Sequence, residues 1–366
     1  MSGLVLCLNS RARAHLLVAL VLSLAASAFA ADRPIVGAIR WDAWTGGEVT
    51  EQVQRTLAPE KYHFRLPWFA EVLAPDRVRI DGSPQSVMDR EIDFAADAGL
   101  DYWAFLIYPQ SNSMSAALEQ YLKSDKKARI KFCVILHGTL SAPTEKWPAE
   151  RDRLLTLMRK PTYQRVLGDR PLVYMFHDGF LKSEKAGRLK ELRDAAGREN
   201  LKLYLVYMGW NPKHDYALAA PAGFDAVSAY AYASSGRFDT YDQLAKATEA
   251  AYWSEAERAQ VPLIPLVTSG WDKRPRIDNP VAWEKDHGYH KESRWISPPQ
   301  PHEIAEHLKR GLQFVDAHPQ VCPARAIIVY AWNEYDEGGW IAPTLGADGK
   351  PNLERLEALR EILRPK

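Results

Sequence analysis

Short apolar segments alternate with amphipathic ones along nearly the whole chain from residue 34 onward. Eight of the apolar segments are rich in β-branched and aromatic residues and are mostly apolar on both faces, which is typical of strands buried in a parallel sheet. We expect strands at residues 34–41, 100–108, 130–137, 171–177, 201–208, 224–232, 261–268 and 326–331.

The segments between these strands carry apolar residues at every third or fourth position among Glu, Lys and Arg. This spacing predicts amphipathic helices. We expect helices at residues 88–98, 115–123, 150–158, 183–196, 241–259 and 304–317. Gly99 closes the first of these helices, and Pro171 and Pro262 open two of the strands.

The order of the elements predicts an α/β fold. Eight strands with helical crossovers indicate a single (β/α)8 barrel, the TIM-barrel fold, over residues 31–366. The alternative is an open doubly wound sheet. The usual nucleotide fingerprint of such a sheet, GxGxxG or GxxxxGK after the first strand, does not occur there. Its absence favours the barrel.

Residues 1–30 have the pattern of a cleaved signal peptide. Arg11 and Arg13 form a basic start, residues 16–26 are apolar, and residues 28–30 (AFA) form a small-x-small cleavage site. The apolar stretch is shorter than the ~20 residues that a membrane span requires. We therefore expect an exported protein, periplasmic or secreted, that is not membrane-associated after cleavage. The sequence does not specify an oligomeric state.

Composition narrows the range of partners. A formal net charge of +1 provides no long-range field that would attract nucleic acid or an anionic membrane. Aromatic residues reach 11%, with 12 Trp and 16 Tyr, and their flat faces suit both sugar-binding clefts and large cores. Two cysteines follow the signal segment, Cys133 and Cys322, and they either pair or remain buried thiols.

Two connections are longer than barrel geometry requires. Residues 45–85 follow the first strand and include an aromatic cluster at residues 62–69, and residues 269–300 follow the seventh strand. Both leave the carboxyl ends of strands, where barrel enzymes build their active sites. Long loops in compact domains are usually functional or disordered, and disordered loops are poor in aromatic residues. We therefore expect both connections to form walls of a cleft.

Residues 331–339, AWNEYDEGG, follow the last predicted strand and place three carboxylates there. Carboxylates at the end of a buried strand are costly unless they are paired, hydrated or used. Glycoside hydrolysis needs two carboxyl groups at the scissile bond, one protonated and one ionised. Glu334 and Glu337 fit this requirement because crowding two acids in a partly dry cleft separates their pKa values. The alternative for a Glu-x-x-Glu pair is a solvated helix face.

The carboxyl ends of barrel strands converge on one mouth, so residues at these ends are candidates for substrate contact. Acids suit proton transfer, amides bind hydroxyl groups, and aromatic rings stack on sugar faces. The candidates are Trp41, Asp42, Tyr108, His137, His177, Asp178, Trp210, Tyr230, Tyr232, Trp271, Asp272, Asn333 and Trp340. Any single ring or histidine fits a core equally well, so the prediction depends on the set.

The positions after strands four and seven also bear on the choice of catalytic acids. The commonest plan of barrel glycosidases places an acid after strand four and a nucleophile after strand seven. No Glu stands at either place, although Asp178 and Asp272 are acids there. This makes Glu334 and Glu337 the leading candidates for the chemistry.

Three segments resemble a known family. Residues 332–338, WNEYDEG, resemble the N-E-W-H-E-G signature of glycoside hydrolase family 99, the endo-α-mannosidase/endo-mannanase family. They are also similar to the W-N-(D/E)-(Y/W)-x-E segment of wider relatives such as the α-1,3-glucanases of family 71. Residues 163–172, YQRVLGDRPL, resemble the family segment before strand four, and residues 270–272, GWD, add a third match.

The resemblance implies a (β/α)8 barrel and a retaining hydrolase of α-linked glycans. It also implies that Glu334 acts as base on the substrate's own 2-hydroxyl, giving a 1,2-anhydro sugar, and that Glu337 is the acid. Tyr335 and Asp336 replace the Trp and His of the signature. The resemblance therefore does not extend to mannose specificity, and an inverting mechanism with Glu337 or Asp178 as partner stays open.

The sequence contains one near-match to a metal site. Residues 302–307, HEIAEH, are similar to HExxH, but the second histidine is one position too late to share a helix face with the first. We assign no metal and no cofactor. The prediction is an exported glycoside hydrolase acting on a poly- or oligosaccharide. The alternative is a catalytically silent carbohydrate-binding or polysaccharide-assembly protein on the same barrel.

Overall fold

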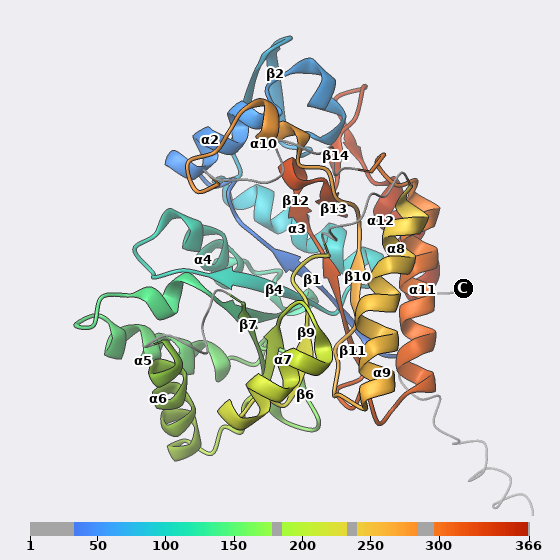
Figure 1. The fold of residues 1–366 in the computed structure, drawn as a ribbon. Coiled ribbons are helices and arrows are strands. Elements are labelled where there is room, and N and C mark those ends of the chain that lie inside the picture. Colours follow the sequence, from blue (N-terminus) through green and yellow to red (C-terminus); the bar gives the residue numbers. More distant parts are fainter. Residues whose placement is uncertain (1–32, 178–184, 233–239, 285–295, 365–366) are drawn as a thin grey trace, which may run out of the picture. The chain divides into compact units, whose positions relative to one another are not determined.

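The computed structural model describes residues 33–177, 185–232, 240–284 and 296–364 (Figure 1). Eight parallel strands lie in one sheet in the order β10-β11-β1-β4-β5-β7-β8-β9, and a ninth, the short antiparallel β6 (Arg165–Val166), pairs with β7. The bounds of the eight parallel strands are β1 (Ile35–Arg40), β4 (Tyr102–Ile107), β5 (Lys131–Leu136), β7 (Arg170–Phe176), β8 (Tyr204–Met208), β9 (Ala226–Ser228), β10 (Leu266–Thr268) and β11 (Ala326–Tyr330). Each falls within or at most one residue outside a predicted strand.

The sheet curls until its two end strands, β9 and β10, nearly meet. The amide of Val227 donates to the Pro262 carbonyl at 2.9 Å, and the amide of Ile264 donates to the Val227 carbonyl at 3.0 Å. Val227 thus forms a single parallel bridge to Leu263, just before β10. The predicted (β/α)8 barrel is confirmed, and the open doubly wound sheet is wrong.

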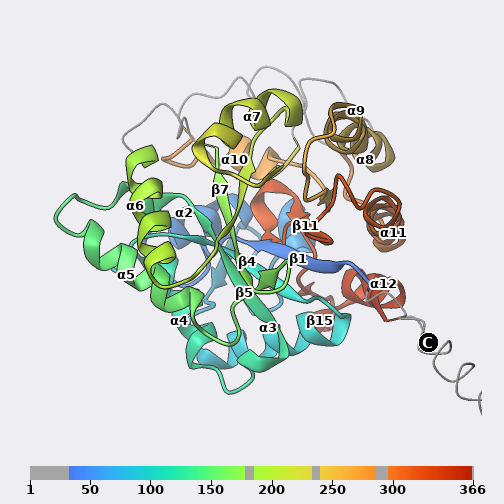
Figure 2. The ribbon, with the colours of Figure 1, turned by 90° about the horizontal axis from the view of Figure 1, so that it is seen from below.

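Helices surround the barrel (Figure 2). The predicted ones are α3 (Gln85–Ala98), α4 (Ala116–Lys123), α5 (Trp147–Met158), α6 (Lys185–Arg198), α8 (Tyr241–Thr248) with α9 (Glu255–Ala259), and α11 (Pro301–Ala317). A π-helical turn, Glu249–Ser254, separates α8 from α9. Gly99 ends α3 as expected, in the left-handed conformation. The predictions missed α2 (Glu48–Leu57), α7 (Pro212–Ala219), α10 (Arg274–Asp278) and α12 (Glu354–Leu363).

Two tyrosine side chains meet in the interior of the barrel. The hydroxyls of Tyr102 on β4 and Tyr174 on β7 hydrogen-bond to each other at 2.8 Å, and Tyr102 also donates to the Ile327 carbonyl of β11 at 3.1 Å. These strands are not neighbours, so the contacts cross the interior. Cys133 and Cys322 are both buried free thiols, so the disulfide that the sequence left open is not formed.

The connection after β1 is more ordered than a loop. It contains α2, a 3-10 helix (Glu60–Arg65) and a hairpin of β2 (Ala70–Ala74) with β3 (Arg77–Ile80). Residues 62–69, expected as a cleft wall, do not line the large cavity at the barrel mouth. The connection after β10 contains α10, and its residues 285–295 lie outside the described residues.

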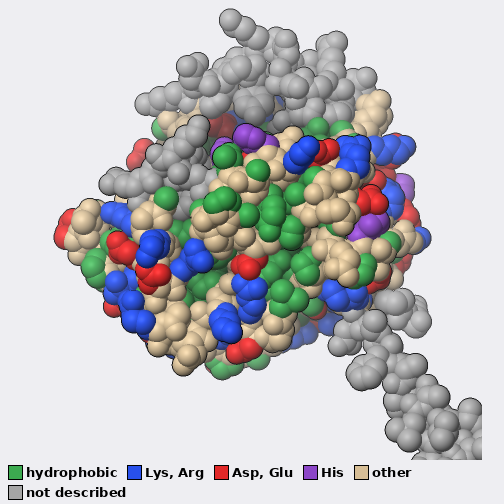
Figure 3. All heavy atoms as spheres, turned by 60° about the horizontal axis from the view of Figure 1, so that its bottom comes forward, with side chains coloured by type: hydrophobic (Ala, Val, Ile, Leu, Met, Phe, Trp, Pro, Cys, Tyr) green, Lys and Arg blue, Asp and Glu red, His purple; other side chains and the backbone are tan. Residues whose placement is uncertain are grey.

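The surface shown in Figure 3 carries positive and negative side chains interspersed around a central area of hydrophobic ones. This mixture agrees with the small net charge of the chain. Within the described ranges, no helix is both long enough and apolar enough to cross a membrane.

Candidate active site

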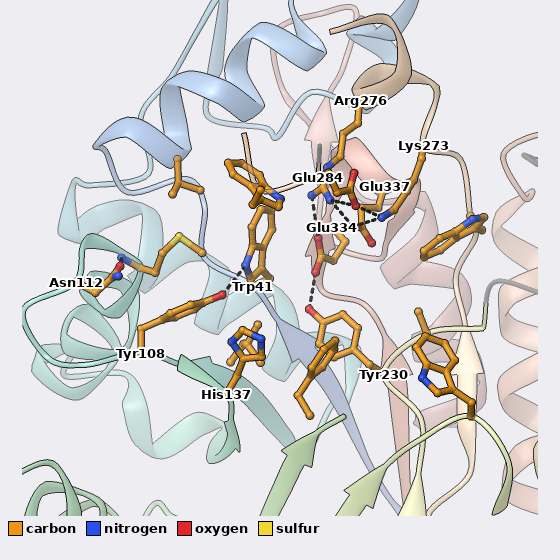
Figure 4. A pocket seen from close by; sticks show the side chains of 18 residues that line it. Trp41, Tyr108, Asn112, His137, Tyr230, Lys273, Arg276, Glu284, Glu334 and Glu337 are labelled. Atoms are coloured by element: carbon orange, nitrogen blue, oxygen red, sulfur yellow. Dashed lines mark hydrogen bonds and ion pairs between the residues drawn. The ribbon is translucent and has the colours of Figure 1, made fainter. Parts of the chain in front are cut away.

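A cavity of about 480 Å3 lies among the carboxyl ends of the barrel strands (Figure 4). Its volume and its mainly apolar walls with a few charged groups are usual for small-ligand sites. The lining residues are Trp41, Val49, Leu106, Tyr108, Asn112, Met114, His137, Phe176, Trp210, Tyr230, Ala231, Trp271, Lys273, Arg276, Trp283, Glu284, Glu334 and Glu337.

The structure brings a large part of the predicted site together in this cavity. The predicted residues that line it are Trp41, Tyr108, His137, Trp210, Tyr230, Trp271, Glu334 and Glu337. The predicted residues that do not line it are Asp42, His177, Tyr232, Asp272, Asn333 and Trp340. Asp178 lies outside the described residues.

The two glutamates lie on a tight hairpin that follows β11. Strand β12 (Asn333–Glu334) leads into a 3-10 turn (Tyr335–Glu337), and β13 (Gly339–Trp340) returns antiparallel to β12. The hairpin places Glu334 at the end of the first arm and Glu337 at the end of the turn. Both side chains consequently reach the same cavity.

Two glycines make this turn possible. Gly338 has a φ of 82°, and a Cβ there would lie 2.4 Å from the amide nitrogen of Asp272. A Cβ at Gly339 would lie 2.2 Å from the ring of Tyr330. Both positions therefore require a residue without a side chain. The Gly-Gly pair allows the hairpin to pack directly against its neighbours.

Glu334 is buried in the cavity wall with one donor. Its Oε1 accepts a hydrogen bond of 2.5 Å from the Tyr230 hydroxyl. Its Oε2 has no hydrogen-bond partner among the described residues, and the Arg276 Nη2 lies 3.9 Å away. Burial, and after it the negative charge of Glu337, raises the pKa of Glu334 well above its ordinary value. This environment favours the neutral carboxylic acid.

Glu337 is also buried, but three donors surround its carboxylate. Its Oε1 accepts from the Arg276 Nη1 and lies 2.9 Å from the Lys273 Nζ, and its Oε2 accepts from the Tyr330 hydroxyl at 2.6 Å. Burial alone would raise the pKa of Glu337. The charges of Lys273 and Arg276, with the Tyr330 hydrogen bond, outweigh burial and lower this pKa to about 2. Glu337 is therefore ionised at neutral pH.

Arg276 connects the acids of the site, and sequence reasoning did not identify it. Its Nε donates to the fully buried Asp336 at 2.6 Å, and its Nη1 also donates to Glu284 at 3.2 Å. Its guanidinium lies 5.2 Å from the ring centroid of Trp41 and 5.7 Å from that of Trp283. The signal available in the sequence was indirect: several acids at one strand end require a buried cation.

The pKa values of the two glutamates are thus shifted in opposite directions. The surroundings of Glu334 favour its neutral acid, and those of Glu337 favour its carboxylate. The family resemblance implies the opposite assignment, with Glu334 as the base and Glu337 as the acid. A base must start the reaction ionised and an acid must start it protonated. The contacts around the two carboxyl groups in the free protein favour the reverse of these states.

Asp42 and Asn333 support the cavity wall rather than line it. The Asn333 Oδ1 accepts from the amide of Trp41 at 2.9 Å, and its Nδ2 donates to Asp42 at 3.2 Å. The Trp44 indole donates to the Asn333 carbonyl at 3.1 Å, and the Arg40 Nε donates to Asp42 at 2.7 Å. These bonds tie the end of β1 to the glutamate hairpin.

Asp272 has a similar supporting position, two residues before the start of α10. Its carboxylate accepts from Arg65 and from the Arg274 Nη2 at 2.8 Å, and its amide donates to the Glu337 carbonyl at 2.7 Å. Burial opposes ionisation of Asp272, but these two arginines lower its pKa below the ordinary value. Asp272 thus fixes the segment that carries Lys273 and Arg276 against the hairpin.

The other predicted residues outside the cavity also contact protein groups. Trp340 is buried, with the Arg355 guanidinium 3.8 Å from its ring centroid. His177 hydrogen-bonds to the Tyr207 hydroxyl. The ring of Tyr232 packs edge-on against Tyr252 with 5.7 Å between centroids.

Aromatic rings form the part of the cavity wall at or after the ends of β1, β4, β5, β7 and β8. The Trp41 indole donates to the Tyr108 hydroxyl at 3.2 Å. The His137 ring lies between Tyr108, with centroids 5.8 Å apart, and Phe176, with centroids 5.1 Å apart. Trp210 is 54% exposed at the rim. These rings offer flat faces of the kind on which sugars stack.

No group of three or more His, Cys, Asp and Glu side chains suited to a metal ion occurs within the described ranges. The segment with the near-match to HExxH forms the start of α11. His307 is buried there and stacks on Trp253 with 5.3 Å between ring centroids. It therefore belongs to the packing between α11 and the π-helical turn.

Fold and site together define a (β/α)8 barrel with a carboxyl pair at its mouth. Among solved structures, the chain is similar to the GH99 endo-alpha-mannosidase from Bacteroides thetaiotaomicron in two forms. One form is in complex with BIS-TRIS-propane, with a TM-score of 0.53, 13% identity and coverage of 90% of this chain and 94% of that one. For the other form the TM-score is 0.53, the identity is 14%, and the coverage is 90% and 96%.

At this level of identity the similarity establishes the fold, so the resemblance to family 99 is confirmed for the architecture of the chain. No protein-family model matches the sequence, and no curated protein matches it. What the barrel binds and which reaction it performs therefore have to be argued from the cavity.

Proposed function

We propose that the protein is a glycoside hydrolase that cleaves O-glycosidic bonds of a poly- or oligosaccharide, with Glu334 and Glu337 as its acid–base pair. One observation carries the proposal: two carboxyl groups of one hairpin line one cavity, and their pKa values are shifted in opposite directions. Glycoside hydrolysis requires one protonated and one ionised carboxyl group at the same pH. A purely structural pair has no need of such a division.

The remaining walls support a carbohydrate substrate. The rings of Trp41, Tyr108, Trp210 and Trp283 border the cavity, and they suit the apolar faces of sugar rings. Asn112 and His137 add polar groups that suit hydroxyls. The fold similarity to an endo-alpha-mannosidase supports an α-linked glycan as the first substrate class to test.

The attacking group is a second part of the proposal. The WNEYDEG motif supports a retaining reaction, in which the substrate's 2-hydroxyl attacks C1 and a 1,2-anhydro sugar forms. NMR spectroscopy of the first product tests this route, because retention gives the anomer of the substrate. The opposite anomer would show direct attack by water and an inverting mechanism.

Export is proposed from residues 1–30, which lie outside the described residues. Their basic start, apolar stretch and AFA site support cleavage after Ala30. Edman sequencing of the protein recovered from the periplasm or the medium should begin at Ala31. Retention of the full-length chain in the cytoplasm would contradict this proposal.

The direct experiment measures release of reducing ends from α-linked mannans and α-1,3-glucans. Glu334→Gln and Glu337→Gln should each lower turnover by ~10²–10⁴-fold. Glu306→Gln is a matched control, because Glu306 is exposed on α11 and pairs with Lys309 away from the cavity. Full activity in both variants of the pair would contradict the proposal. Sugar binding without any release of reducing ends would identify a silent carbohydrate-binding or polysaccharide-assembly protein instead.

A further inference from the structure

We propose that Arg276 and Lys273 fix Glu337 as the carboxylate of the site, so that Glu334 is the group that protonates the leaving group. This assignment rests on the proposed glycoside hydrolase activity and reverses the roles that the motif alone implies. It is carried by the donors around each carboxyl group. It also gives Arg276 and Lys273 a function as positioning residues.

The donors around Glu337 suit this carboxylate to act as a base. A carboxylate offers about four lone-pair sites, two on each oxygen. Arg276 and Lys273 occupy Oε1, and the Tyr330 hydroxyl occupies one site of Oε2. A proton on Oε1 would displace a charged donor. The remaining site on Oε2 can accept a proton from an attacking hydroxyl, so Glu337 is equipped as a base.

The surroundings of Glu334 suit the complementary task. Its Oε1 has a donor in Tyr230, while its buried Oε2 has no hydrogen-bond partner in the described part of the chain. An ionised Oε2 would be a buried charge without a hydrogen bond, which is costly. A proton on Glu334 removes this charge. Glu334 lines the cavity, so a glycosidic oxygen bound there would accept this proton once the carboxyl group turns toward it.

Backbone contacts determine which glutamate receives the cations. Lys273 immediately precedes α10, and Arg276 lies on this helix. The amide of Asp272 donates to the Glu337 carbonyl at 2.7 Å, which ties the approach to α10 to the turn that bears Glu337. Asp336 accepts from the Arg276 Nε at 2.6 Å. The guanidinium is thereby held beside Glu337, and its nearest approach to Glu334 is 3.9 Å.

Among the described residues, the charged and titratable groups around the pair come from three regions. They are Tyr230 after β9, Lys273, Arg276 and Glu284 after β10, and Tyr330 and Asp336 in β11 and the hairpin. Glu284 shares both cations with Glu337, at 3.2 Å from the Arg276 Nη1 and in contact with the Lys273 Nζ. The raised pKa of Glu334 and the lowered pKa of Glu337 agree with this arrangement.

The proton transfers balance within one step. Glu334 donates its proton to the glycosidic oxygen as the bond from C1 to this oxygen breaks, and the leaving group departs as an alcohol. Glu337 accepts the proton of the attacking hydroxyl as the new bond from oxygen to C1 forms. Glu334 ends ionised and Glu337 ends neutral, and exchange with solvent or the reverse transfer in a second step restores the pair.

Activated substrates distinguish the two roles. The probes are α-mannan and α-1,3-glucan beside 2,4-dinitrophenyl α-glycosides of mannose and glucose, whose leaving group needs no proton. Glu334→Gln should lose ~10²–10⁴-fold on the polysaccharide but no more than ~10-fold on the activated glycoside. Glu337→Gln should lose activity on both.

Three outcomes separate this proposal from the one on which it rests. Sparing of Glu337→Gln on the activated glycoside would overturn the assignment and restore the roles implied by the motif. Equal losses on both substrates in both variants would also overturn it. Inactivity of the wild-type protein on every α-linked probe would contradict the glycosidase function itself.

A pH profile tests Lys273 as a positioning residue. The acid limb of kcat/KM reports the ionisation of the base in the free enzyme. Wild-type protein should show no acid limb between pH 7 and pH 4, because the pKa of Glu337 is about 2. Lys273→Met should introduce a limb in this range, and Lys273→Arg should remove it again. Lys61→Met is the control, because Lys61 is exposed and pairs with Asp278 outside the cavity.

A structural role for Lys273 makes a different prediction. Lys273→Met would then lower kcat/KM by the same factor at every pH. That result, or an acid limb that persists in Lys273→Arg, would overturn the positioning role.

Discussion

The cavity has a charged wall and an aromatic wall, and the two differ in how their side chains are held (Figure 4). The charged wall consists of Lys273, Arg276, Glu284, Glu334 and Glu337. Its members follow β10 and β11 and contact one another through ion pairs and hydrogen bonds. Each charge there depends on the presence of its neighbours.

The aromatic wall consists of Tyr108, His137, Phe176 and Trp210, at or after the ends of β4, β5, β7 and β8. Its rings meet mostly edge to face, with centroids 5.1 Å apart for His137 and Phe176 and 5.8 Å apart for Tyr108 and His137. Such contacts are individually worth about 0.5–1.5 kcal/mol. A change in one ring therefore leaves the others largely in place.

We infer from this difference that stability and chemistry are coupled on the charged wall and separable on the aromatic wall. Removing one charge from a buried network leaves its partners without compensation, which is expensive. Removing one ring from an open rim mainly removes contact area for a ligand. Substitutions on the two walls should consequently fall into two classes of effect.

Arg276→Met should have the largest effect on stability. The substitution keeps most of the side-chain volume but leaves Asp336 and Glu337 without their shared cation. We expect a loss of about 3–5 kcal/mol in the free energy of unfolding, measured by urea denaturation.

Arg274→Met is the matched control on the same helix. Arg274 is 36% exposed, and its partner Asp272 keeps Arg65 when Arg274 is removed. We expect a loss of no more than about 1 kcal/mol. Equal losses for the two variants would contradict the coupling of charges in the charged wall.

In the charged wall, the sequence predicts the two glutamates but not the two cations beside them. Glu334 and Glu337 were predictable because a motif places both acids on one hairpin after a buried strand. Arg276 and Lys273 were assigned only to a long connection, since a cation belongs to a site through the acids that fold beside it. The short α10, which positions Arg276, was missed because five residues with a proline show no helical period.

Several residues predicted for the site do not line the cavity, and the reason is different. Asp42, Asp272 and Asn333 do lie near the barrel mouth, because parallel strands end together. Whether a side chain after a strand points into the mouth depends on backbone turns that a pattern of residue types does not encode. Phe176 and Leu106 show the converse, because they line the cavity from within strands and look like core residues in the sequence.

Trp210→Ala tests the aromatic wall. Trp210 is 54% exposed, so its loss should leave the melting temperature unchanged. Loss of one stacking face should raise KM for the cleaved glycan by ~10-fold with little change in kcat. Phe64→Ala is the control, because Phe64 is 48% exposed but does not line this cavity. A fall in kcat without a change in KM would place Trp210 with the chemistry instead.

The smallest expected effect is a difference between Glu334 and Glu337 in how each contributes to the pH dependence of the melting temperature. For Glu334 the folded-state pKa is raised above the ordinary 4.5. As pH rises above 4.5, the unfolded chain releases this proton while the folded chain keeps it, so the wild-type protein loses stability. Glu334→Gln should therefore match wild type near pH 4 and exceed it at pH 7, at roughly 2 °C per kcal/mol.

Glu337→Gln should show the opposite sign. The pKa of Glu337 is lowered from 4.5 to about 2, so its carboxylate contributes stability above pH 4.5 that disappears as pH falls toward 2. The variant should melt below wild type at pH 7, and the difference should shrink between pH 4.5 and pH 2. Differential scanning fluorimetry of both variants from pH 2 to pH 7 measures the two slopes. Slopes of the same sign would mean that the two glutamates share one environment, and the division of the charged wall into an acid and a base would fail.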